Sequence, residues 1–252
     1  MKTRSEFSGI KESESGAQSA GMGREAARET RLTLSLTVLL CLAAMLIRAA
    51  APVGAEPSVK IVCGNLIYAG SQSSVCFADR FLSDVARETS LKVDPKFSAV
   101  RLDSDALFDH PFCVWSGNES FTLTKKEREN LRKYLLNGGF LLVSPGCSDE
   151  KWDKSFRTEM KLVLPEAEYG LNKLPMNHPV FSVVNQIPRL TDKHGKQALL
   201  EGIEIHGRLA LVHSAEGLND VANAKGCCCC GGNEIANPAR VNVNVMTYSL
   251  LH

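Results

Sequence analysis

The sequence predicts an α/β domain in which helices cover both faces of a mostly parallel sheet. Two observations lead to this fold class. Apolar runs rich in β-branched residues alternate with amphipathic segments of helical period, and short turns rich in glycine or serine connect them. Strands that alternate with helices pair in parallel, because each helix carries the chain back across one face of the sheet.

The first strand and helix are expected between residues 59 and 88. Residues 59–68 (VKIVCGNLIY) are apolar and rich in β-branched side chains, which favours a strand. Serine and glutamine at 71–74 indicate a turn. Phe77, Phe81 and Val85 then follow at four-residue spacing, which places them on one face of a helix.

The second unit begins with a strand at residues 111–115 (PFCVW). After a polar loop, Thr124 and Glu127 have the spacing of a capping box, which predicts the start of a helix. Gly138 and Gly139 are expected to end this helix in the left-handed conformation that glycine adopts at little cost.

Residues 140–143 (FLLV) follow directly and predict a strand that is buried on both faces. After a turn at residues 144–147 (SPGC), Ser148 or Asp149 can cap another helix. Its buried face is expected to carry Trp152, Phe156, Met160 and Val163.

The last third of the chain is less regular. Residues 165–200 show no sustained period and predict loops with short helical turns. Residues 203–205 and 209–212 predict a hairpin or two adjacent edge strands. The terminal segment fits both a strand and a helix, and Asn237 followed by proline favours the helix.

The N-terminal segment predicts export. Residues 32–47 are apolar, uncharged and preceded by arginines, as in a secretory signal. A helix of this length spans about 24 Å, less than the hydrocarbon layer of about 30 Å. We therefore expect residues 1–55 to be a polar leader and signal peptide cleaved before Glu56, with an uncleaved membrane anchor as the alternative. Residues 56–252 would then form one periplasmic or extracellular domain.

Charge restricts the partners. The 252-residue chain has 29 basic and 28 acidic residues, a net charge of +1, so no overall field attracts nucleic acid. We expect a small molecule or a cell-envelope protein as the partner. Contact with the membrane is expected only through the N-terminal segment.

A family resemblance supports the fold class. The run from LDSDALFDHPFCVW to KYLLNGGFLLVSPGC, followed by FRTEM, NHPVF and LLEGIEIHGRLALVHS, resembles the bacterial family called domain of unknown function 4159 (DUF4159). The resemblance covers roughly residues 59–252. This family is similar to class I glutamine amidotransferase-like and trehalose-utilisation-like domains, which implies a flavodoxin-like sheet. It implies no established activity, and Ser144 to Gly146 stand where many members have an acidic residue.

Cys147 is the candidate nucleophile. It follows a buried strand and precedes a helix, where reactive groups gather in open α/β sheets, and a helix start lowers the pKa of a thiol. Amidotransferase-like folds place a nucleophilic cysteine at a comparable turn, and His178 or His213 would be its base. The alternative is a loop cysteine or a disulfide partner.

Four adjacent cysteines at 227–230 are a second candidate. Cys227 and Cys230 have C-x-x-C spacing, which suits a tetrahedral, zinc-like metal or a redox pair. A complete metal site would need ligands from elsewhere in the chain. In an exported protein, disulfide formation is the favoured interpretation.

The leading functional hypothesis is a non-catalytic ligand-binding or interaction module, because no complete set of nucleophile, base and orienting group is visible in the sequence. Its expected site is the crevice at the carboxyl edge of the sheet, lined by Gly117, Asn118, Ser144, Cys147 and His213. The alternatives are an amidotransferase-like hydrolase that uses Cys147 and a metal-binding or redox function of Cys227 to Cys230.

Overall fold

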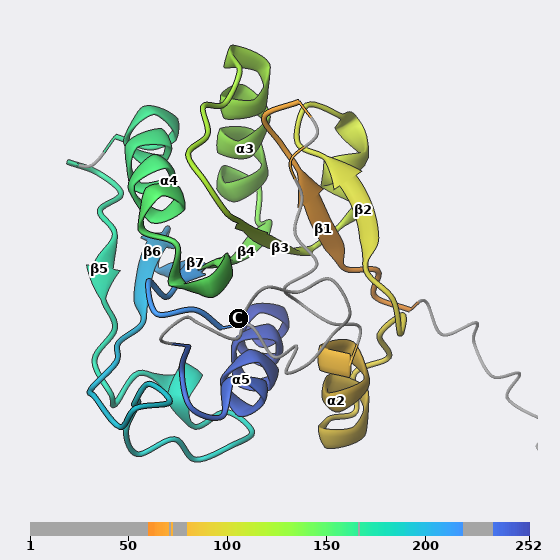
Figure 1. Ribbon diagram of the computed structural model, residues 1–252. Helices are drawn as coiled ribbons and strands as arrows, with labels where there is room; N and C mark the ends of the chain where they lie inside the picture. Colours follow the sequence, from red (N-terminus) through yellow and green to blue (C-terminus); the bar gives the residue numbers. More distant parts are fainter. Residues whose placement is uncertain (1–59, 71, 73–79, 166, 219–233) are drawn as a thin grey trace, which may run out of the picture. The chain divides into compact units, whose positions relative to one another are not determined.

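A seven-stranded sheet forms the centre of the computed structural model, which describes residues 60–70, 72, 80–165, 167–218 and 234–252 (Figure 1). These residues belong to one compact unit, Ser58–His252. The strand order is β2-β1-β3-β4-β7-β6-β5. The strands are β1 (Gly64–Ile67), β2 (Ser98–Arg101), β3 (Phe112–Gly117), β4 (Phe140–Pro145), β5 (Asn172–Lys173), β6 (Glu201–Ile205) and β7 (Arg208–His213).

The first five strands of this order are parallel, and the last two are antiparallel to their neighbours. The five parallel strands lie in the order β2-β1-β3-β4-β7. Numbered by their own sequence along the chain, this is the order 2-1-3-4-5 of flavodoxin-like sheets. The predicted fold class is therefore confirmed, with β6 and β5 added as an antiparallel extension.

Four α-helices of the described chain cover the two faces of the sheet (Figure 1). They are α2 (Arg80–Glu88), α3 (Lys125–Leu136), α4 (Glu150–Val163) and α5 (Pro238–Leu251). Helices α2 and α5 pack on one face with Phe140 and Leu142 of β4, whereas α3 and α4 pack on the other face with Leu141 and Val143. Strand β4 is buried along its whole length, as its apolar run predicts.

The start of α3 confirms the capping box. The Thr124 hydroxyl accepts a hydrogen bond from the Glu127 amide, and the Glu127 carboxylate accepts one from the Thr124 amide. At the other end, only Gly138 is left-handed, with φ of +100°. Gly139 is required for a different reason, because a Cβ atom there would lie 2.4 Å from the ring of Tyr134.

One boundary needs correction, because strand β4 continues through Ser144 and Pro145 and the turn starts later than predicted. Asp149, one of the two expected caps, caps α4. The hairpin, one of the two expected arrangements, is present as β6 and β7 and lies inside the sheet, because β7 also pairs with β4 and β6 with β5. The edge strands β2 and β5 were not predicted, since both are too short to show a period.

Several sequence features lie outside the described residues, among them the leader and signal segment at 1–55 and the cysteines Cys227 and Cys230. Of the described helices, none combines the length and apolarity needed to cross a membrane. Export and the state of the four adjacent cysteines therefore stay predictions.

Truncation of the central strand should be costly. Phe140→Ala removes a fully buried ring that stacks on Phe112, so we expect a loss of about 3–5 kcal/mol in the free energy of unfolding, measured in urea. The matched control is Leu162→Ala on α4, whose side chain is 61% exposed and should cost less than about 0.5 kcal/mol. Equal losses in the two variants would contradict the assignment of β4 to the core.

Candidate functional site

The carboxyl edge of the parallel strands was the expected site, and Gly117 at the end of β3 lies there. A Cβ atom at this position would lie 1.9 Å from the Tyr68 hydroxyl and 2.6 Å from Nε1 of Trp152. That indole nitrogen donates a hydrogen bond of 2.6 Å to the Tyr68 hydroxyl. Gly117 is thus needed for the close packing of two aromatic side chains over the strand end.

Ser144 serves a structural contact. It is fully buried, and its hydroxyl accepts a hydrogen bond of 2.6 Å from the Leu218 amide. The Leu218 carbonyl in turn accepts a hydrogen bond of 2.9 Å from the Asn242 side chain on α5. Ser144 therefore holds the segment that follows β7 against the end of β4.

Asn118, after β3, is half-buried. Cys147 lies in the turn between β4 and α4 and is also half-buried. Its backbone is left-handed, with φ of +54° and ψ of +31°. Ser148 is also left-handed, with φ of +55°, and its hydroxyl donates a hydrogen bond to the Glu216 carbonyl. Consecutive left-handed residues are unfavourable for side chains with a Cβ atom, so the surrounding contacts hold this turn.

His178 lies at the other end of the sheet. Its Nδ1 accepts a hydrogen bond from the Val180 amide, and its ring packs 5.2 Å from that of Tyr248. The Tyr248 hydroxyl interacts with the backbone of Leu209, near the start of β7. His213 is the last residue of β7, about 13 Å further along the strand. The structure therefore does not bring His178 to the turn that carries Cys147.

His213 forms a buried charged cluster with three residues that the sequence analysis did not single out. Its Nδ1 lies 3.2 Å from Oε2 of Glu201 on β6. Its Nε2 lies 2.8 Å from Oδ1 of Asp153 on α4, in contact but not aligned for a hydrogen bond. The imidazole is fully buried and stacks on Phe156 at 4.7 Å. Both ring nitrogens therefore face carboxylates rather than Cys147.

Arg157 completes this cluster. Its Nε donates to Oδ2 of Asp153 at 2.8 Å, and its two terminal nitrogens donate to the two oxygens of Glu201 at 3.2 and 2.5 Å. Such a bidentate arrangement fixes both the position and the orientation of the carboxylate. The Arg157 side chain is 35% exposed and each carboxylate 17%, so the cluster opens to solvent on the arginine side.

The cluster shifts the pKa values of its members. Burial alone would raise the pKa of Glu201, but hydrogen bonds from His213 and Arg157 outweigh this effect and lower it to about 2. Burial would also raise the pKa of Asp153, but the adjacent His213 and the Arg157 guanidinium outweigh burial and lower it below its usual value. The hydrogen bonds to Glu201, more than the opposing effect of burial, raise the pKa of Arg157. Both carboxylates are thus charged at neutral pH.

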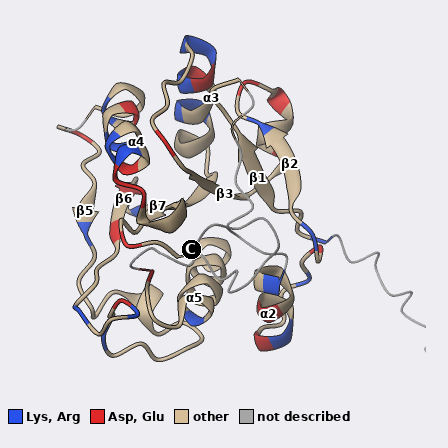
Figure 2. Ribbon diagram, in the orientation of Figure 1, with Lys and Arg blue, Asp and Glu red and all other residues tan. Residues whose placement is uncertain are grey.

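The sequence held only a weak signal for this cluster. Asp153 and Arg157 are four residues apart on α4, the spacing of a helical ion pair, and they flank the buried Phe156. Nothing local links them to Glu201 or His213, which are 44 and more residues away along the chain. Figure 2 shows acidic residues on both α4 and β6, where these two elements meet.

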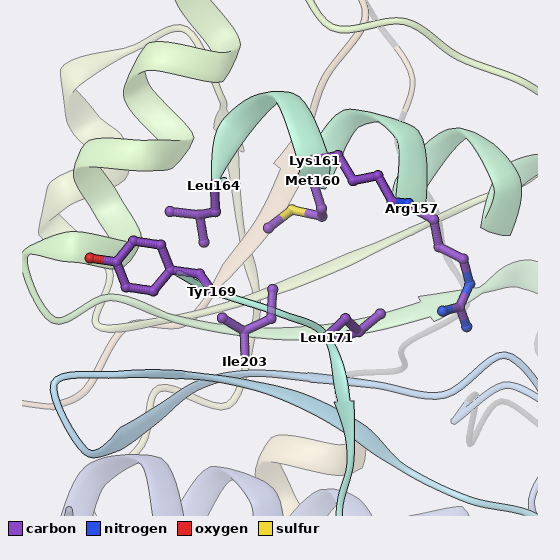
Figure 3. Close-up of a pocket in the computed structure, with 7 residues that line it drawn as sticks. All are labelled: Arg157, Met160, Lys161, Leu164, Tyr169, Leu171 and Ile203. Carbon is purple, nitrogen blue, oxygen red and sulfur yellow. The ribbon is translucent and has the colours of Figure 1, made fainter. Parts of the chain in front are cut away.

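A pocket of about 180 Å³ lies beside the cluster (Figure 3). Most of its lining is apolar and comes from α4, from β6 and from the segment before β5. The lining residues are Arg157, Met160, Lys161, Leu164, Tyr169, Leu171 and Ile203. Arg157 belongs to both the pocket and the charged cluster, so the cluster forms one wall of the pocket.

Comparison with known proteins identifies the family. The family model described as Domain of unknown function (DUF4159) matches residues 69–250 of the chain. The chain belongs to this family. No curated protein matches the chain. The DUF4159 match includes the described strands β2 to β7, helices α2 to α4, all but the last residue of α5, the charged cluster and the pocket.

A metal site is not evident in the part of this DUF4159 chain that the structure describes. Among those residues, no group of three or more histidine, cysteine, aspartate or glutamate side chains is arranged to hold a metal ion. The Arg157 guanidinium instead bridges Asp153 and Glu201, the two carboxylates that His213 contacts.

Removal of the Glu201 charge should change how stability depends on pH. The folded pKa of about 2 lies below the usual value of about 4.3, so this carboxylate stabilises the fold above pH 4.3 and loses that effect toward pH 2. We expect Glu201→Gln to destabilise the protein at pH 7 by on the order of 2 kcal/mol and progressively less below pH 4. Urea unfolding at several pH values measures this difference.

The control is Glu119→Gln, which removes one partner of an exposed ion pair with Lys151. This change should cost less than about 1 kcal/mol at any pH. A cost of Glu201→Gln that does not vary between pH 7 and pH 2.5 would contradict the charged state assigned to Glu201.

Proposed function

We propose that this chain is a non-catalytic binding module and that the pocket beside α4 is its recognition site. The observation that carries the proposal is the composition of the pocket. Met160, Leu164, Leu171 and Ile203 provide apolar walls, and Tyr169 adds an aromatic ring. Binding sites for small groups in proteins have such an apolar lining with a few polar groups at one end.

The size of the pocket determines what enters it. A volume of about 180 Å³ is below the range of about 300–1,000 Å³ typical of pockets that bury a whole drug-sized ligand. An apolar cavity of about 150 Å³ accepts benzene. The pocket therefore suits one aromatic ring or one branched aliphatic group, either free or as part of a larger partner.

The charges around the pocket favour an uncharged group. Two cationic side chains line the pocket: Lys161 is exposed at the rim, and the Arg157 guanidinium is already bound by the carboxylates of Asp153 and Glu201. An anion would have to compete with both of these carboxylates, and a buried cation would lose its hydration without gaining a free carboxylate. An apolar group gains the burial of its own surface and of the aliphatic walls.

The residues that the sequence places at the carboxyl edge of the sheet also support a binding module. Gly117, Ser144 and His213 are each committed to packing or to hydrogen bonds within the fold. These internal contacts account for the three residues without a catalytic role.

A second candidate function is the amidotransferase-like hydrolase with a Cys147 nucleophile. The left-handed backbone of Cys147, directly after a parallel strand, favours it, because strained strand-to-helix turns present nucleophiles in several hydrolase folds. The surroundings of His213 favour the binding module instead, because both ring nitrogens contact carboxylates.

Alkylation separates these two functions. Under the binding-module proposal, iodoacetamide modifies Cys147 only slowly at pH 6 and faster as the pH rises, read by mass spectrometry across pH 5 to 10. The Cys147→Ser variant is the control for modification of other cysteines. A Cys147 that reacts rapidly at pH 6 would favour the hydrolase.

Occupation of the pocket can be tested with indole as the probe. We expect indole to bind with a dissociation constant in the millimolar range and to shift the NMR signals of the Met160 methyl group and the Tyr169 ring. Leu171→Trp should fill the pocket and abolish these shifts. The matched control, Leu162→Trp, places the same ring on the exposed side of α4 and should preserve them.

The proposal fails if indole at 10 mM leaves the signals of the pocket residues unchanged. It also fails if the two tryptophan variants bind indole equally well, because binding would then lie elsewhere on the protein.

A further inference from the structure

We propose that the open edge of β5, together with the pocket, binds an extended peptide segment of a partner protein. One apolar side chain of the segment fills the pocket, and the main chain of the segment pairs with β5. This inference rests on the proposed function, since it needs the pocket to accept an apolar group. It adds the class of partner and the way in which the partner is held.

Strand β5 is the outermost strand on its side of the sheet (Figure 1). Its two residues, Asn172 and Lys173, are exposed, and among the described residues their only strand partner is β6. Just after the strand, the Leu174 amide donates to the Leu200 carbonyl at 2.8 Å. Because bonded and non-bonded pairs alternate in antiparallel ladders, the N–H and C=O groups of Lys173 point away from β6.

Outward-pointing backbone groups at a sheet edge accept a further strand, which is a common mode of peptide recognition. A strand added at β5 would lie about 4.8 Å from it. Continued by one residue, the β5–β6 register places Leu171, just before β5, opposite Ile203, and both residues line the pocket. The pocket is therefore on the same face and next to the same edge, within reach of one side chain of the added strand.

The charges at the rim indicate what flanks the apolar side chain. Lys161 lines the pocket with its side chain exposed, and Lys173 extends the basic rim along the strand, where Figure 2 shows a basic residue on β5. Glu168, which interacts with the Tyr169 hydroxyl, lies at the other end of residues 168–173, the stretch that leads into β5. An acidic residue of the peptide is therefore expected near Lys173 and not near Tyr169.

The same lysine argues against a second copy of this chain as the occupant. Antiparallel pairing of two β5 edges would bring two Lys173 side chains together, and like charges on opposing strands are destabilising. Lysines at exposed edges are a known means of preventing self-association of sheets. An acidic partner segment removes this repulsion.

The test is selection from a phage library of random decapeptides on the folded full-length chain. We expect enriched peptides to combine one aromatic or branched aliphatic residue with an acidic residue two positions away, the spacing of one strand face. Binding of a synthetic copy of the most enriched peptide is then measured by fluorescence anisotropy. Failure to enrich any peptide would contradict the proposal.

Three variants identify the binding surface. Lys173→Pro removes the outward N–H group and should weaken the peptide at least tenfold, and Leu171→Trp should do the same by filling the pocket. The matched control is Ala99→Pro on the opposite edge strand β2. The amides of Ser98 and Leu102 donate toward β1, so the Ala99 N–H group also points outward. Ala99→Pro should leave the peptide affinity unchanged, and circular dichroism checks that all three variants are folded.

The outcomes separate this inference from the proposed function. Indole binding without peptide enrichment would overturn the inference and retain the pocket as a binding site. Absence of both would overturn the two together. Peptides whose affinity is unaffected by Lys173→Pro bind elsewhere and contradict the inference, as does concentration-dependent dimerisation that Lys173→Pro abolishes, because the occupant would then be a second copy.

Discussion

The burial of β4 on both faces is the constraint on which the arrangement of the other described elements depends. Phe140 and Leu142 point to one side of the sheet, and Leu141 and Val143 point to the other. Neither side can face water, so helices must cover both. The chain meets this requirement with α3 and α4 on one face and α2 and α5 on the other (Figure 1).

Two layers of helix leave few places where a partner can approach. The faces of the sheet are covered, and at its carboxyl edge the described residues Gly117, Ser144 and His213 are used for packing. The antiparallel strands β6 and β5 extend the sheet beside α4, where the pocket and an open strand edge occur together. The extension thus provides a surface that a purely parallel sheet of this kind would not have.

The charged cluster connects this extension to the parallel part of the domain. Asp153 and Arg157 belong to α4, Glu201 to β6 and His213 to β7. Burial of four ionisable groups costs hydration free energy. Apolar side chains of similar volume in place of such a network can give a more stable protein. The geometry of the cluster is specific, however, because a bidentate guanidinium accepts only one placement of each carboxylate. We infer that the cluster fixes the position of β6 relative to α4 and thereby the shape of the pocket.

The sequence predicted the elements whose signals are local. The capping box at Thr124 and Glu127 and the apolar run of β4 involve neighbours in the chain, and both are present. The two-residue strand β5 could not be predicted, because its only requirement is pairing with a distant hairpin. The charged cluster was missed for the same reason: Asp153 and His213 are 60 residues apart, and their contact is a product of the finished sheet.

The pairing of Tyr68 with Trp152 occupies the position where sheets of this strand order commonly hold a ligand. In doubly wound sheets, cofactors settle where the winding of the strands changes direction, which in this strand order is between β1 and β3. Tyr68 directly follows β1, Gly117 ends β3, and the two aromatic side chains close over that glycine. At this point the sheet has the strand order of flavodoxin-like sheets, but the protein's own indole and phenol rings fill the position beside Gly117.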